Sequence, residues 1–70
     1  MTSKHKLARK GIIEYIDKDG HVSILDLDTG ERFGTLFQNN KPGGFSVGEE
    51  VFFTIVKNVH DYLIDQIWRN

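Results

Sequence analysis

Few residues of this 70-residue chain have the type and spacing that catalysis or metal binding requires. The three histidines, His5, His21 and His60, are not spaced as metal ligands. The chain has no cysteine, so it offers neither a thiolate ligand nor a disulfide framework. No Ser or His lies in a recognisable nucleophile motif. We therefore predict that the protein is not an enzyme and uses no metal or cofactor.

One acidic tripeptide, Asp28-Thr29-Gly30, is similar to the catalytic tripeptide of aspartic proteases. That chemistry needs two carboxylates that share a proton, and a homodimer could supply the second one. However, Glu31 and Arg32 follow directly and place charges where such enzymes need small residues. We interpret the tripeptide as a hairpin turn in which Gly30 takes a positive φ.

The elements that would position functional residues begin with the segment 11–24. Apolar and β-branched residues there flank the turn residues Asp17-Lys18-Asp19-Gly20, which predicts two strands joined by a turn. A long loop, 38–44, separates three predicted strands from two more. The pattern predicts an all-β fold, a small five-stranded antiparallel OB-type barrel made of a three-stranded meander, a long loop and a two-stranded hairpin. The predicted strands are Lys10–Ile16, His21–Leu27, Arg32–Phe37, Val51–Val56 and Tyr62–Trp68.

The charges are distributed unevenly along the chain. We expect a flexible basic tail at 1–9 and a single domain at 10–70. The first ten residues hold four of the nine basic residues and no acid, which leaves five basic and ten acidic residues for the rest. A nucleic-acid-binding protein usually presents a basic face, so this acidic body argues against that function. No apolar run reaches the roughly 20 residues that cross a bilayer, and no secretory signal is recognisable, so we expect a cytoplasmic protein with no membrane partner.

Several short motifs point to a family. Gly44-Phe45 is followed by Gly48-Glu49-Glu50-Val51-Phe52-Phe53-Thr54-Ile55, which has the form Gly-x-x-Val-x-Phe-x-Ile. In the N-terminal half, Gly11 and Ile13 open the first strand, and Asp19-Gly20-His21-Val22-Ser23-Ile24 forms the second. Over about Lys10–Trp68 these motifs resemble a divergent cold-shock domain, whose second strand carries Lys-Gly-Phe-Gly-Phe-Ile.

The resemblance implies binding of single-stranded RNA or DNA through bases stacked on exposed aromatic side chains. Tyr15 lies where the family has a stacking Trp, and His21 where it has the first Phe of that motif. Ser23 lies at the second Phe and cannot stack, while Glu14 and Asp19 replace lysines, so the expected binding is weak and sequence-tolerant. The predicted nucleic-acid site comprises Tyr15, His21, Phe33, Phe37 and Phe45, with Lys10, Lys18 and Lys41 at the phosphates.

Two questions about this site stay open in the sequence. The register of the third strand places Phe33 and Phe37 either on the binding face or in the core, because a one-residue slip reverses every side chain. Phe45 either caps the end of the barrel or touches the ligand.

A second function is also open. Phe52 and Val56 share the outer face of the fourth strand and, with Tyr62 or Trp68 on an adjacent strand, could form an apolar patch, which we call the Phe52 face. The barrel would then have lost nucleic-acid binding and would act as a protein-interaction or dimerisation module. Gly-x-Ile and alternating Val-x-Ile also suit other RNA-binding OB families, such as the TRAM domains.

Overall fold

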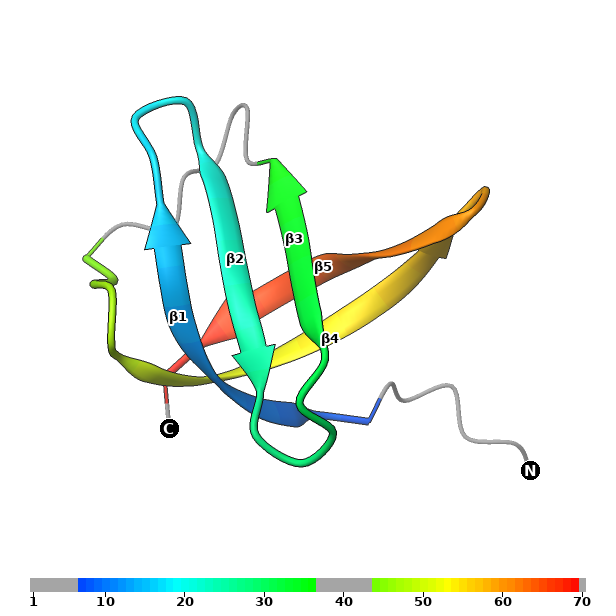
Figure 1. The fold of residues 1–70 in the computed structure, drawn as a ribbon, viewed down its shortest axis with the longest axis horizontal. Coiled ribbons are helices and arrows are strands. Elements are labelled where there is room, and N and C mark those ends of the chain that lie inside the picture. Colours follow the sequence, from blue (N-terminus) through cyan, green and yellow to red (C-terminus); the bar gives the residue numbers. More distant parts are fainter. Residues whose placement is uncertain (1–6, 37–43, 70) are drawn as a thin grey trace.

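The computed structural model of this protein describes residues 7–36 and 44–69, and in them five strands close into a barrel (Figure 1). The order of the strands around the barrel is β1-β2-β3-β5-β4. The predicted all-β, five-stranded OB-type barrel is confirmed. No helix in the described part of the chain is long and apolar enough to cross a membrane. The strands are β1 (Arg9–Ile16), β2 (His21–Asp26), β3 (Arg32–Leu36), β4 (Glu50–Asn58) and β5 (Asp61–Trp68).

The strand directions differ in one place from the predicted antiparallel barrel. β1 pairs antiparallel with β2 and β4, as do β2 with β3 and β4 with β5. β3 and β5 run parallel and pair at Gly34 and Leu63. Strands in a closed ring can alternate in direction all the way round only if their number is even. Five strands therefore require at least one parallel pair, and the barrel places it at β3–β5.

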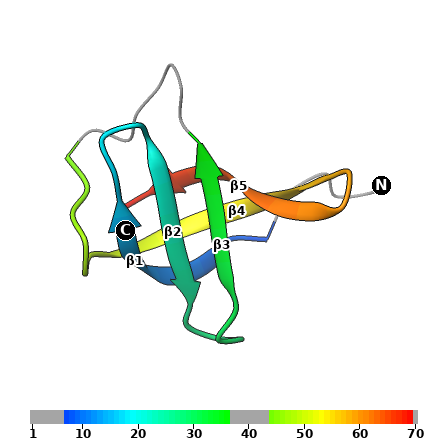
Figure 2. The same ribbon diagram turned by 45° about the horizontal axis from the view of Figure 1, so that its top comes forward.

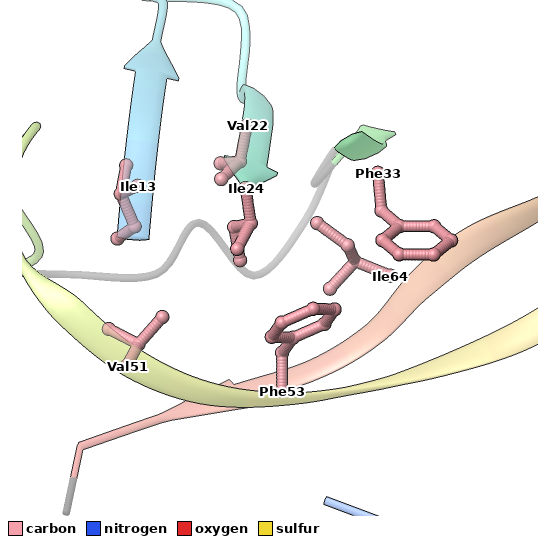
Figure 3. Packing of buried hydrophobic residues seen from close by; sticks show 7 residues of the cluster. All are labelled: Ile13, Val22, Ile24, Phe33, Val51, Phe53 and Ile64. Carbon is pink, nitrogen blue, oxygen red and sulfur yellow. The ribbon is translucent and has the colours of Figure 1, made fainter. Parts of the chain in front are cut away.

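The core of the barrel consists of inward-facing residues from all five strands (Figure 3). The rings of Phe33 and Phe53 meet in its centre with centroids 5.9 Å apart and planes tilted by 51°. Phe33 is only 9% exposed and pairs with Ile24, so the structure has the β3 register that buries this ring. The core residues are Ile13, Val22, Ile24, Phe33, Val51, Phe53 and Ile64.

Gly11 allows β1 to pass close to the core. A Cβ on this residue would lie 2.4 Å from Cγ2 of Ile24 and 2.6 Å from the carbonyl oxygen of Leu25. It would also lie 2.9 Å from Cε1 of Phe53. Real Cβ atoms do not approach other atoms this closely, so packing of the core explains why β1 has a glycine at this position.

Two aspartates organise the hairpin turns. The Asp17 carboxylate accepts hydrogen bonds from the backbone N–H groups of Asp19 and His21, at 2.8 and 3.0 Å, and so closes the β1–β2 turn. The Asp26 carboxylate accepts from the N–H groups of Asp28 and Thr29, at 2.8 and 3.1 Å. Asp28-Thr29-Gly30 is thus the turn between β2 and β3, with Gly30 at φ 78° as predicted.

Asp26 also explains why β1 begins earlier than predicted. Arg9, assigned to the tail, is the first residue of β1, where it pairs with Phe53. Its Nη1 donates a 2.8 Å hydrogen bond to Oδ2 of Asp26. Burial alone would raise the pKa of Asp26, but this bond and those from Asp28 and Thr29 outweigh it, so that pKa lies below its usual value.

The β4–β5 hairpin projects beyond the rest of the barrel (Figures 1 and 2). Its tip contains Val59, which is exposed and has a φ of 51°, an uncommon conformation for a β-branched residue. Val56 and Tyr62 are also exposed on this hairpin. The projecting hairpin therefore carries the exposed side chains of Val56, Val59 and Tyr62, which are apolar or aromatic.

Candidate nucleic-acid interface

On the outer face of the β1-β2-β3 sheet, one row of residues combines an exposed aromatic side chain with two small residues. In this row Tyr15 on β1 pairs with Ser23 on β2, and Ser23 pairs with Gly34 on β3. The Tyr15 side chain is 53% exposed, whereas Ser23 is small and Gly34 has no side chain. The result is an exposed ring beside a low floor of two small residues. We call this surface the Tyr15 face and its two small residues the floor.

A β-bulge places Tyr15 on this face. The register of β1 against β2 shifts between Ile13 and Tyr15, which leaves Glu14 as the extra residue. Strict alternation would put Tyr15 on the same side as the buried Ile13. The bulge reverses the alternation, so Tyr15 faces outward and Ile16 packs against the core. The ring is thus exposed because of an irregularity in the strand.

Two acidic side chains border the Tyr15 face, and each contacts a basic residue. At one border Arg32 Nε donates a 2.8 Å hydrogen bond to Glu14 Oε1, and both residues are exposed. At the other, His21 Nδ1 lies 2.9 Å from Asp17 Oδ2, and the Tyr15 hydroxyl donates to the same oxygen at 3.4 Å. The hydrogen bond from the backbone N–H of His21 is the main cause that lowers the pKa of Asp17. The border is therefore close to neutral rather than basic.

The structure brings together only part of the predicted site. Tyr15, His21 and Lys18 lie on or beside the Tyr15 face, all three exposed. Phe33 lies in the core, so its ring is not available on that face. Phe37 and Lys41 lie outside the described residues.

Phe45 contributes to packing rather than to the Tyr15 face. Its ring is partly buried against the core, and the guanidinium of Arg69 lies 4.5 Å from the ring centroid. Arg69 also donates hydrogen bonds to the carbonyl of Gly44 and to the carboxylate of Glu49. The hydrogen bond from Arg69 is the main cause that lowers the pKa of Glu49. Phe45 is thus held from both sides.

Lys10 lies beside the Phe52 face. Its ammonium is 5.9 Å from the centroid of the Phe52 ring, and the two residues pair across β1 and β4. Phe52 in turn pairs with Trp68 across β4 and β5, with ring centroids 6.2 Å apart and planes 27° apart. The sequence pattern predicted Phe52 and Trp68 on one patch, but it did not place Lys10 beside them. The pairing of β1 with β4 in a closed barrel is the signal that could have placed it there.

Among residues 7–36 and 44–69 no group of three or more His, Cys, Asp or Glu side chains is arranged to hold a metal ion. Comparison with protein-family models, with curated proteins and with solved structures finds no match to this chain. The case for a function therefore depends on the geometry of these two faces.

Proposed function

We propose that this protein binds single-stranded nucleic acid, RNA or DNA, on the Tyr15 face. The observation that carries the proposal is the exposed Tyr15 ring beside the floor of Ser23 and Gly34. A base that stacks on the ring can lie over the floor, because no side chain rises from Gly34. Stacking of a base on an aromatic ring contributes about 1–3 kcal/mol and is sequence-tolerant. OB barrels commonly use this face of strands two and three for oligonucleotides.

The basic residues around the face suit phosphates. Arg32 is held by Glu14 in an exposed ion pair, and such pairs contribute only about 0–1 kcal/mol. A phosphate can therefore take the place of the carboxylate at little cost. Lys18, in the β1–β2 turn, lies at the opposite border. Asp17 and Glu14 offset these charges, so the proposed binding is weak. The resemblance to cold-shock domains supports the same function.

The test is the affinity of the protein for fluorescein-labelled dT12 and U12, measured by fluorescence anisotropy at low salt. Tyr15→Ala should weaken binding about 5- to 100-fold, the equivalent of one lost stack. Tyr15→Phe should bind like the wild type. Tyr62→Ala is the matched control, because Tyr62 is also 53% exposed but lies on the projecting hairpin. Equal affinities for Tyr15→Ala and the wild type, or no binding by the wild type, would refute the proposal.

The second candidate function is protein contact or dimerisation through the Phe52 face. Val56 and Trp68 are exposed there, whereas Tyr62 pairs with Lys57 and lies on the opposite side of the hairpin. Phe52 itself is half-buried between Trp68 and Lys10 of its own chain, which reduces the apolar area left for a partner. Sedimentation velocity over a hundredfold range of protein concentration tests this candidate, and a constant monomer mass would count against dimerisation.

A further inference from the structure

We infer that Lys10, Phe52 and Trp68 form a second stacking position for the same nucleic-acid strand. The inference rests on the proposed function and extends it from one face of the barrel to the next. Trp68 would stack a base, and Lys10 would contact a phosphate beside it.

The Trp68 ring is both exposed and held in position. It stays 37% exposed although its neighbour Phe52 is half-buried. The near-parallel contact with Phe52 holds the indole in place, at a centroid distance of 6.2 Å. A ring that is both exposed and held in position loses little conformational freedom when a base stacks on it.

Lys10 places a positive charge on the same surface. The Lys10 ammonium lies 5.9 Å from the Phe52 centroid, so a cation is next to the two rings. A basic group beside exposed aromatic rings is the combination with which proteins hold single strands. This combination favours a nucleic acid over a purely apolar protein partner for this surface. Glu50, which is exposed and pairs with Ile12, precedes Phe52 by two residues on β4 and is an acidic neighbour that a phosphate must avoid.

β1 connects the two proposed stacking positions. Tyr15 and Lys10 are both exposed on β1, which belongs to the Tyr15 face through β2 and to the Phe52 face through β4. Five residues of β-strand span about 16 Å. Five nucleotides cover this distance even at the stacked spacing of about 3.4 Å each. OB barrels engage roughly 4–16 nucleotides, so one bound strand can occupy both positions.

The experiment uses Trp68 as its own reporter, because it is the only tryptophan of the chain. Titration with unlabelled dT12 should quench the tryptophan fluorescence, with the midpoint that anisotropy gives for labelled dT12. Tyr15→Ala should move both midpoints to higher oligonucleotide concentration. Trp68→Leu should weaken dT12 binding about 5- to 100-fold, whereas Trp68→Phe, which keeps an aromatic ring, should lose much less.

Lys10→Gln provides the charge test, with Lys57→Gln on the projecting hairpin as the matched control. The slope of log K against log salt should fall by about 0.7 for the first and stay unchanged for the second. Circular dichroism confirms that each variant is folded.

The outcomes separate the two proposals. Binding by anisotropy with unchanged tryptophan fluorescence and wild-type affinity of Trp68→Leu would overturn the second position and leave the proposed function intact. Absence of binding by anisotropy would refute the proposed function itself. A concentration-dependent shift of the tryptophan emission without any oligonucleotide would show that a second copy covers the Phe52 face, which would also overturn the inference.

Discussion

Arg9 Nη1 lies 2.8 Å from Oδ2 of Asp26, and this ion pair joins the first residue of β1 to the last residue of β2. Asp26 is 2% exposed, so its carboxylate depends on protein donors rather than on water. Because the same carboxylate holds the β2–β3 turn, one buried charge fixes the ends of three strands.

Replacement of Arg9 by Gln should lower the free energy of unfolding by about 1–3 kcal/mol, because it removes a charged donor from a buried acceptor. Arg32→Gln is the matched control, since it breaks an exposed pair with Glu14 and should cost about 0–1 kcal/mol. Urea unfolding at pH 7 measures both. Equal losses in the two variants would contradict a special role of Asp26.

The same pair predicts a dependence on pH. The folded state lowers the pKa of Asp26 below its unfolded value of 3.8, so the stabilisation is complete above pH 3.8. It is lost as the pH falls through the lower, folded pKa. Wild type should therefore exceed Asp26→Asn in free energy of unfolding from pH 5 to 7, and the difference should shrink below pH 3.8. Urea unfolding from pH 7 to pH 2 tests this, and a constant difference over that range would contradict it.

Gly11→Ala should destabilise the barrel by about 1–3 kcal/mol, because its Cβ would overlap Ile24, Leu25 and Phe53. Gly34→Ala is the control, since among the described residues its Cβ would meet only the carbonyl oxygen of Val22, at 3.6 Å. It should change the stability by no more than about 0.5 kcal/mol. Thermal unfolding that ranks the two variants in the opposite order would contradict the observed packing.

Gly34→Leu tests the floor of the Tyr15 face without removing any aromatic ring. The added side chain should occupy the space beside Tyr15 and weaken dT12 binding, whereas Gly34→Ala should leave it nearly unchanged. Anisotropy titrations of the two variants, with unfolding curves for each, separate blocked binding from lost stability. Wild-type affinity of a folded Gly34→Leu variant would show that bases do not use the floor.

Thr54→Val should raise the free energy of unfolding by about 1 kcal/mol. Thr54 is buried, and its hydroxyl has no hydrogen-bond partner within the described part of the chain, so a methyl group there removes a desolvation cost. Thr29→Val is the contrasting variant, because the Thr29 hydroxyl accepts a hydrogen bond from the N–H of Glu31. Chemical denaturation should show a gain for the first and a loss for the second; a loss for Thr54→Val would contradict the assignment.

The regular parts of this fold could be predicted because they depend on local patterns. The turn at Asp17–Gly20 and the alternation of Val51, Phe53 and Ile55 on β4 give strands and an inner face directly. The parallel pairing of β5 with β3 follows from the closure of a five-stranded barrel. The sequence of a single strand does not contain this information.

The candidate site was harder to predict, because it depends on an irregularity and on a long-range pairing. The bulge at Glu14 moves Tyr15 outward against the alternation of its strand. Lys10 comes next to Phe52 only when β1 pairs with β4. Neither Asp26 as a buried carboxylate nor Arg9 as its partner follows from residue type alone, since both usually lie at the surface.

The order of the strands also has a consequence for how the chain is made. β4 covers the free edge of β1, and β5 covers the free edge of β3, so both edges of the meander are closed by the last two strands of the barrel. A growing polypeptide emerges from the ribosome with its N-terminal part first. Until the C-terminal hairpin has emerged, the three-stranded meander therefore has two open edges. Open edges of β-sheets are the sites at which these sheets aggregate.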